Sequence, residues 1–494
     1  MLQLILAALL PLSLPAAVPL AIPIAIRSVL PHLLTSAKKS RAAEPSAPAA
    51  AAASYDKYLN ALTSLGRFSG AVLVARDGKI EFRSAYGYAD VEKRTPFIVE
   101  SQIEIASLSK MFTARAILKL RDAGKLKLGD SVCDHMHDCP DAWRPITIEE
   151  LLRHTSGIPD YEDALELDSP KYLAYMTQPD SSRRILENAV NQPLDFPPGS
   201  KFKYSNTGYV VLGYVIEQAS GEPFGKFMDD EILKPAGMSH SGIFGYGAPP
   251  AHLAIGYTHG DTDWSDMLRG VRLEDEHLTA LPQLPLTPPH GDAGMFSTID
   301  DLYAWSVAMD GGALVPASLS AEIFSPGRDG YGYGWAIGEE YGDKRYQHIG
   351  LLPGYDSALI KFPDQRITIV VASNLDRIRL GTISSTLDAI ALGKPWDMPV
   401  TGDVIRLDAA QQVTLAGDYK LADGRMVTIA ADGDSVSLQV KDKFLAGLIP
   451  LTATRFYMPM SDGVVTFLLG SDGHASAINL HYKGEDHIGP LVTP

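Results

Sequence analysis

The sequence EIASLSKMFTARAILKL, residues 104–120, decides how the rest of the chain is interpreted. It places Ser107 three residues before Lys110, at the beginning of a run with the apolar periodicity of a helix. Residues three apart on a helix share a face, so the serine hydroxyl and the lysine amine would be neighbours. A lysine amine removed from water can act as the base that activates a serine nucleophile. The stretch therefore predicts an acyl-transfer site at the start of a helix.

Spacing alone does not establish such a site, because the same Ser-x-x-Lys pattern occurs three more times. The other copies begin at Ser36, Ser54 and Ser200. They lack the setting of Ser107, where a helix N-terminus would also offer backbone N–H groups to a developing oxyanion. The prediction therefore depends on what other segments supply.

Two further segments carry residue types that would complete the site. In FPPGSKFKYSNTGYVVLGYVIE (196–217), Tyr204 and Asn206 precede a predicted helix, and an extended backbone would aim the phenol and the amide the same way. In YQHIGLLPGYDSALIKF (346–362), His348 lies on a predicted strand, and Gly350 would let the backbone approach a substrate. Both short patterns also occur elsewhere, at 58–60 and 487–489, so neither is specific by itself.

The order Ser-x-x-Lys, Tyr-x-Asn, His-x-Gly, with its surroundings, resembles the serine β-lactamase and penicillin-binding-protein superfamily. Its class C-like serine hydrolases, which include D-aminopeptidases, D-alanyl-D-alanine carboxypeptidases and esterases, are the most similar branch. The resemblance covers about residues 55–393 and extends to LLRHTSGIPDY (151–161), GMSHSG (237–242) and AGMFSTIDDLYAW (293–305). It implies a β-lactamase-like fold of the α+β or α/β class.

The resemblance also implies roles for the site residues. Ser107 would attack the substrate carbonyl and form an acyl-enzyme. Lys110 and Tyr204 would act as the proton-transfer pair, with Tyr204 partly in its phenolate form. Asn206 would orient Lys110 and hold the substrate amide. His348 would tune Tyr204 and pass a proton to the leaving group.

Two positions around the predicted strand bear on the oxyanion hole and on the substrate. The resemblance places the oxyanion hole at the backbone N–H groups of Ser107 and Leu351. In many relatives this tripeptide is Lys or His, then Thr or Ser, then Gly. The hydroxyl of its middle residue helps to bind a free carboxylate of the substrate. Ile349 cannot do this, which argues against β-lactamase activity and against strict carboxypeptidase activity.

The chain is therefore predicted to be a serine hydrolase that cleaves peptide-like amides, including peptides with D- or other unusual residues. Carboxylesterase and β-lactamase activity are the alternatives within enzymes. A penicillin-binding sensor or scaffold, acylated without turnover, is the alternative outside enzymes. The expected partner is a small peptide, amide or ester, and no cofactor or metal is expected.

Hydropathy and turn signals predict how the chain is divided. Strands at both ends of residues 54–393, with helices between them, predict an antiparallel sheet flanked by helices and carrying an inserted, mostly helical subdomain. Within this region a short helix is predicted over 55–65, Asp77-Gly78 predicts a hairpin, and Gly221 is predicted to end the helix that follows Asn206. A linker is predicted at 394–408. Short alternating strands separated by Asp-Gly turns then predict a small all-β domain at 409–494, a barrel or a sandwich, which resembles the lipocalin-like domains of some relatives.

Residues 1–53 have the composition of an export leader followed by a low-complexity tether. The first 26 residues are apolar and uncharged, and prolines at 11, 15, 19 and 23 disfavour a stable membrane-spanning helix. Ala-rich sequence with several possible Ala-x-Ala cleavage sites follows. The protein is therefore predicted to be periplasmic or secreted, with an uncleaved membrane anchor as the alternative and no other membrane domain.

The two cysteines and the net charge limit the remaining possibilities. Cys133 and Cys139 lie in VCDHMHDCP (132–140), which in an exported protein favours a disulfide or free thiols over a metal site shared with His135 and His137. A formal net charge of −16 argues against a nucleic-acid or anionic-membrane partner.

Two other histidines stand in segments near the predicted site. His154 lies in RHTSG and His290 in PPHGD. Because hydrogen-bonded histidines are common in protein interiors, both are interpreted as structural rather than as site residues.

Overall fold

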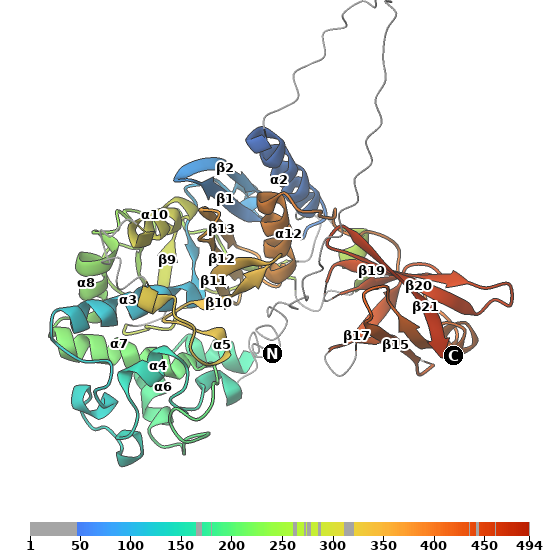
Figure 1. Ribbon diagram of the computed structural model, residues 1–494. Coiled ribbons are helices and arrows are strands. Elements are labelled where there is room, and N and C mark those ends of the chain that lie inside the picture. Colours follow the sequence, from blue (N-terminus) through green and yellow to red (C-terminus); the bar gives the residue numbers. More distant parts are fainter. Residues whose placement is uncertain are drawn as a thin grey trace, which may run out of the picture.

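The computed structural model describes residues 47–164, 170–178, 180–259, 264–270, 273, 278–284, 288–310, 321–433, 435–440, 444–459 and 461–493. Figure 1 shows two bodies, a larger one with a central sheet and many helices, and a smaller β-barrel at the C-terminal end. Residues 1–46, on which most of the predicted leader and tether falls, lie outside the described residues.

A six-stranded antiparallel sheet forms the centre of the larger body, in the order β10-β11-β12-β13-β1-β2. The hairpin predicted at Asp77-Gly78 joins its first two strands. The sheet is completed late in the larger body, as predicted, because β13, near its end, pairs with β1, near its beginning. Its strands are β1 (Gly70–Arg76), β2 (Lys79–Tyr86), β10 (Ala336–Glu340), β11 (Asp343–Leu352), β12 (Tyr355–Phe362) and β13 (Ile367–Ser373).

One face of this sheet is covered by two helices, α2 (Ala47–Ser64) and α12 (Leu380–Leu392) (Figure 1). They come from the beginning and the end of the sequence that forms this body. Side chains alternate along each strand, so Val72 and Val74 face these helices while Ala71 faces the opposite layer. Ile383 and Leu387 recur at helical spacing on α12 and enter the same core. Helix α2 begins at residue 47, earlier than predicted, so the predicted tether ends inside a helix.

The other face of the sheet packs against the inserted helical region, which forms the largest apolar core. Helix α7 ends where predicted, at Gly221 with φ +78°, a backbone conformation that glycine adopts without strain. The α-helices of this layer are α3 (Ser109–Asp122), α4 (Ile148–Leu152), α5 (Pro170–Met176), α6 (Ser181–Ala189), α7 (Asn206–Ser220), α8 (Phe224–Met228) and α10 (Ile299–Asp310). Helix α9 (Trp264–Arg269) lies apart from this layer, and its Leu268 packs against Leu451 and Tyr457 of the C-terminal domain.

Short helical turns and strands connect these elements. The turns are η1 (Ala106–Leu108), η2 (Val132–His135), η3 (Asp141–Trp143), η4 (Tyr161–Ala164), the π-helical η5 (Asp229–Leu233) and η6 (Arg328–Gly330). The strands are β3 (Tyr88–Asp90), β4 (Thr95–Pro96), β5 (Ile103–Glu104), β6 (Gly242–Ile243), β7 (Tyr257–Thr258), β8 (Thr279–Ala280) and β9 (Met295–Ser297). In the small sheet β5-β9-β6, β5 leads directly into η1.

The predicted all-β domain is a closed eight-stranded barrel, which decides between the barrel and the sandwich. A short helix α13 (Ala409–Val413) precedes it. Alternate side chains, among them Val427, Ile429 and Phe467, fill its apolar interior. Its strands are β14 (Gly417–Lys420), β15 (Met426–Ala431), β16 (Val436–Val440), β17 (Phe444–Pro450), β18 (Arg455–Met458), β19 (Gly463–Leu469), β20 (Ala475–Tyr482) and β21 (Glu485–Thr493).

Polar contacts hold the barrel against the larger body. The Arg379 guanidinium, at the start of α12, donates a hydrogen bond to the Tyr457 hydroxyl and lies 3.2 Å from the Asp462 carboxylate. On the opposite side of the junction, Lys483 donates to Glu340 at 2.6 Å. Because Glu340 ends strand β10, the barrel contacts the edge of the central sheet directly. None of the helices within the described ranges is long and apolar enough to cross a membrane.

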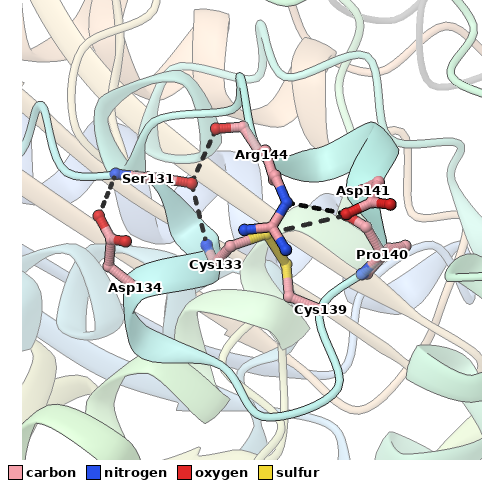
Figure 2. Close-up of a disulfide and its surroundings, with 7 residues drawn as sticks. All are labelled: Ser131, Cys133, Asp134, Cys139, Pro140, Asp141 and Arg144. Carbon is pink, nitrogen blue, oxygen red and sulfur yellow. Dashed lines mark hydrogen bonds and ion pairs between the residues drawn. A yellow bond between two sulfur atoms is a disulfide. The ribbon is translucent and has the colours of Figure 1, made fainter.

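Cys133 and Cys139 form a disulfide in the loop that follows α3 (Figure 2). Ser131 organises this loop, because its hydroxyl accepts a hydrogen bond from the Cys133 N–H at 3.2 Å and donates to the Arg144 carbonyl at 2.8 Å. Since both thiols are used in the disulfide, the alternative of a metal site at these residues does not hold.

Substituting Leu387→Ala is expected to destabilise the larger body by about 2–5 kcal/mol, because the fully buried side chain leaves a cavity between α12 and the sheet. Urea unfolding monitored by tryptophan fluorescence checks this, since all five tryptophans precede the barrel. Leu468→Ala, at a barrel position that is 45% exposed, is the matched control and should change the midpoint little. Equal midpoints for the two variants would contradict the assignment of this core.

Candidate active site

Ser107 lies in η1, immediately before α3, at the point where a short strand turns into a helix. The preceding residue, Ala106, has φ +50°, a left-handed conformation that costs free energy for any residue with a Cβ atom. Strained backbone of this kind is held in place by its surroundings and is concentrated at functional sites. The local structure therefore presents Ser107 on a sharp turn at the start of the helix, as the sequence predicted.

Lys110 is fully buried, and its amine makes three polar contacts. Its Nζ lies 3.0 Å from Ser107 Oγ, 2.7 Å from Asn206 Oδ1 and 2.9 Å from the Asp292 carbonyl oxygen. Burial lowers the pKa of the Lys110 amine to about 8, although the carboxylates of Asp292, Glu162 and Asp160 oppose this shift. The amine is therefore neutral for part of the time near neutral pH.

The partners of Lys110 dictate which way its lone pair points when the amine is neutral. Asn206 Oδ1 and the Asp292 carbonyl can only accept hydrogen bonds, so they take the two N–H donors. The lone pair is then left for the Ser107 hydroxyl, which is the third contact. Lys110 is therefore arranged to remove the proton of Ser107.

A carboxylate that the sequence analysis did not single out fixes the orientation of Asn206. Asp160 Oδ2 accepts hydrogen bonds from the Asn206 backbone N–H at 3.0 Å and from its Nδ2 at 3.2 Å. Because a carboxylate accepts and does not donate when ionised, the amide oxygen of Asn206 must face Lys110. Burial raises the pKa of Asp160 to about 6, and its hydrogen bonds to backbone N–H groups oppose this. Asp160 follows the Ser-Gly-Ile-Pro of the LLRHTSGIPDY segment, which was the available signal.

Tyr204 faces the same site from the loop before α7, with the Lys110 amine 4.9 Å from the centre of its ring. Ser205 caps α7, accepting a hydrogen bond from the Gly208 N–H, and this turns the chain from an extended segment into the helix. Burial raises the pKa of the Tyr204 phenol well above its usual value, and a hydrogen bond with Ser107 only partly offsets this. The expected phenolate character is therefore wrong for the resting site, because removal from water disfavours the anion.

His154 lies in this site, packed among aromatic rings, although its sequence context suggested a purely structural residue. Its ring is 4.2 Å from that of Tyr204 and 4.6 Å from that of Tyr331. Its Nδ1 accepts a hydrogen bond from the Ser205 N–H at 3.1 Å, so it also holds the turn before α7. Burial lowers its pKa well below the usual value, and the charge of Lys110 adds to the shift. His154 is thus a neutral support for Tyr204.

His348 stands on β11 next to this group, but its nitrogens face other partners. Nδ1 lies 2.8 Å from the Ile349 carbonyl and Nε2 lies 2.9 Å from the Tyr331 hydroxyl. The ring centre is 6.4 Å from that of Tyr204. Burial lowers the pKa of His348 to about 3, so the imidazole is neutral. Tyr331, which no motif indicated, therefore occupies Nε2 of His348, and the role of His348 in tuning Tyr204 stays a prediction.

Gly350 is required by a close approach within the protein, and its predicted approach to a substrate stays a prediction. A Cβ atom at this position would lie 2.2 Å from the Ile105 carbonyl and 2.4 Å from Ser357 Oγ. Glycine thus lets β11 lie directly against the turn that carries Ser107. Leu351 lines the same cleft as Ser107, and its part in an oxyanion hole stays a prediction.

A cleft with about 950 Å³ of space, part of it open to solvent, exposes these residues. Ile337, Ile349 and Leu351 form an apolar wall. The acidic side chains Glu162, Asp329 and Glu339 also line it. The one basic residue among the described lining residues, Arg345, is 2.8 Å from Asp388, a buried residue of α12.

Gly350→Ala is expected to displace the turn of Ser107, because the added methyl group would overlap the Ile105 carbonyl. The rate at which a fluorophosphonate labels Ser107 should fall by at least about 100-fold, the cost of a misplaced reacting group. Gly129→Ala, where an added Cβ atom would meet no heavy atom within 4 Å, is the control. Labelling of Gly350→Ala at the parental rate would show that the approach is not tight.

The labelling rate of Ser107 is expected to rise with pH through about 8, because the neutral form of Lys110 increases as its proton is lost. Lys110→Arg should remove this rise, since a guanidinium stays protonated. A stopped assay with mass-spectrometric detection of the adduct measures both. A rate that is constant between about pH 6 and 10 would exclude Lys110 as the base.

Comparison with known proteins assigns this arrangement to a family. The beta-lactamase family profile matches residues 55–391. Penicillin-binding protein 4* of Bacillus subtilis (strain 168) is 29% identical over 435 residues, which cover 83% of this chain and 92% of that protein.

Solved structures agree with the fold. The octameric penicillin-binding protein homologue from Pyrococcus abyssi superposes with a TM-score of 0.61 at 22% identity, over 88% of this chain and 99% of that one. The D-amino acid amidase from Ochrobactrum anthropi SV3 gives 0.58 at 19% identity, over 70% and 99%. At these identities the two structures show a shared fold alone. With the profile match, which confirms the resemblance seen in the sequence, the chain belongs to the beta-lactamase family of serine hydrolases.

Proposed function

We propose that this protein is an exported amidase or peptidase that hydrolyses an amide bond through an acyl-enzyme on Ser107. The observation that carries this proposal is the buried amine of Lys110, 3.0 Å from the Ser107 hydroxyl, with its other two contacts to acceptors. The Cys133–Cys139 disulfide supports export, because such bonds persist in oxidising compartments.

In the proposed reaction Lys110 takes the hydroxyl proton as Ser107 Oγ attacks the substrate carbonyl. The backbone N–H groups of Ser107 and Leu351 stabilise the oxyanion. Tyr204, as a neutral phenol, passes its proton to the leaving amine. It then takes from Lys110 the proton that Lys110 removed from Ser107. Water then attacks the acyl-enzyme by the reverse sequence and regenerates Ser107.

The cleft supports a substrate with a free amino group next to the bond that is cleaved. The acidic side chains Glu162, Asp329 and Glu339 line it, while Arg345 is engaged by Asp388. Ile349 lacks the hydroxyl that would help to bind a carboxylate.

Glu162 lines the cleft together with Ser107, and burial raises its pKa to about 8, with a further contribution from Asp160. A substrate ammonium would supply the positive charge that this carboxyl needs to ionise.

The stereochemistry of the substrate is proposed from a structural relative. The D-amino acid amidase from Ochrobactrum anthropi shares the fold over 70% of this chain. We therefore propose that amides and short peptides of D-amino acids are among the substrates.

Product analysis by mass spectrometry tests the proposal. The panel holds amides and dipeptides of D- and L-amino acids with free and acetylated amino groups, a p-nitrophenyl ester and nitrocefin, with Ser107→Ala as the control. Cleavage of free-amino amides that Ser107→Ala abolishes is the expected result. Turnover of the ester alone would make the protein a carboxylesterase, and rapid nitrocefin turnover a β-lactamase. A stable acyl adduct without turnover would make it a penicillin-binding sensor.

Glu162→Gln is expected to lower kcat/KM for free-amino substrates by at least about 30-fold, because it removes the charged partner of the ammonium. Acetylated substrates should change little. Glu339→Gln, at the exposed edge of the same cleft, is the matched control. Equal losses on free and acetylated substrates would rule out recognition of the amine by Glu162.

A further inference from the structure

A buried chain of polar groups stands behind Lys110, on the side away from Ser107. Asp292, which is 1% exposed, accepts at Oδ1 from His290 Nδ1 at 3.0 Å and at Oδ2 from the Tyr161 hydroxyl at 3.0 Å. Its backbone carbonyl accepts from Lys110 at 2.9 Å. His290 Nε2 lies 2.9 Å from the Ser181 hydroxyl. Neither the Asp292 carboxylate nor Tyr161 has a role in the mechanism above, which uses only the backbone carbonyl of Asp292.

The order Ser181, His290, Asp292 has the hydrogen bonds of a hydrolytic triad, but its burial excludes that use. Ser181 is 0% exposed and lies in the first turn of α6. A substrate carbonyl cannot reach it there. The chain of hydrogen bonds instead ends at Asp292, next to the amine of Lys110.

The hydrogen bonds show which form the Asp292 side chain takes. Burial raises the pKa of the Tyr161 phenol well above its usual value, so Tyr161 donates. Because His290 Nδ1 faces one carboxylate oxygen, it donates as well, and Nε2 can accept from Ser181. Burial opposes the charge on Asp292, but the interactions with His290, Lys110 and Tyr161 together outweigh it, so the pKa of Asp292 lies below its usual value.

The other titratable groups around Lys110 differ from Asp292 in charge. Burial raises the pKa values of Asp160 and Glu162 to about 6 and about 8, so both are more readily protonated than Asp292. The remaining neighbours are neutral: burial lowers the pKa values of the histidines and raises those of the phenols, which are His154, His348, Tyr204 and Tyr209. Burial lowers the pKa of Lys110, and among these groups Asp292 makes the largest contribution that raises it.

We propose that Asp292 is the buried counter-ion of Lys110 and sets the pH range in which that amine can act as a base. His290 and Tyr161 are positioning residues, because their hydrogen bonds keep the Asp292 side chain ionised while its backbone carbonyl faces the amine. The inference rests on the proposed role of Lys110 as the base. It gives roles to the Asp292 carboxylate, His290 and Tyr161, which the proposed reaction does not use.

Asp292→Asn tests this, because it removes the charge and keeps the shape and the backbone carbonyl. The pKa of Lys110, read from the resonance of ¹³Cε-labelled lysine and assigned with Lys110→Arg, is expected to fall by about one unit, the usual effect of losing a nearby opposite charge. The pH at which Ser107 labelling reaches half its maximum should fall equally, so labelling becomes faster at low pH. A general loss of structure would instead slow labelling at every pH.

Two further variants complete the experiment. Ser181→Ala removes a hydrogen bond at the far end of the chain without changing charge near Lys110, and should leave the profile unchanged. Tyr161→Phe removes one of the two donors to Asp292 and should shift Lys110 in the same direction by less. An unshifted Lys110 in folded Asp292→Asn overturns the proposal. Should that variant not fold, an unshifted Lys110 in Tyr161→Phe overturns it equally.

The resonance of Lys110 is independent of turnover, so the two proposals can fail separately. A shifted Lys110 with no substrate cleaved would refute the proposed function and keep the counter-ion. Ser107-dependent cleavage with an unshifted Lys110 would do the reverse.

Discussion

Burial of one amine is the constraint on which this structure depends. Lys110 is removed from water, and an amine in that position is costly unless each of its donors has an acceptor. The acceptors come from Asn206 and Asp292, which are far from Lys110 in sequence. The inserted helical region and the loop before β9 must therefore both fold against α3 before the site exists. Because a neutral lysine has two N–H donors and one lone pair, satisfying the donors also aims the lone pair at Ser107.

Low polarity around this amine also settles the protonation of its neighbours. The same burial that lowers the pKa of Lys110 keeps His154 and His348 neutral and Tyr204 protonated. The resting site thus contains few charges besides the amine and the carboxylates around it.

The barrel is a separate apolar unit that nevertheless contacts the larger body close to the cleft. Its interior is filled by its own side chains. Lys483, at the turn between β20 and β21, pairs with Glu340 at the end of β10. The adjacent residue, Glu339, lines the cleft. The appended domain is therefore placed where it can restrain β10, the edge strand of the sheet.

Much of this protein was determined by local sequence. The hairpin at Asp77-Gly78, the stop of α7 at Gly221 and the pairing of Ser107 with Lys110 follow from turn chemistry and helical spacing, which act over a few residues. The alternating strands of the C-terminal domain were predicted for the same reason. The site residues of the three short motifs could be found because each motif is contiguous.

Only the tertiary structure decided the partners that arrive from elsewhere. Tyr331 belongs to none of the quoted motifs, while Asp160 and Asp292 lie in LLRHTSGIPDY and PPHGD, which do not reveal their partners. The contacts of all three depend on how separate segments pack. The protonation of Tyr204 was predicted wrongly because sequence does not reveal how completely a side chain is removed from water. The interpretation of His154 missed the site for a related reason, since its ring reaches Tyr204 only in the folded protein. Spacing along the chain determined which groups could react, and burial decided their charges.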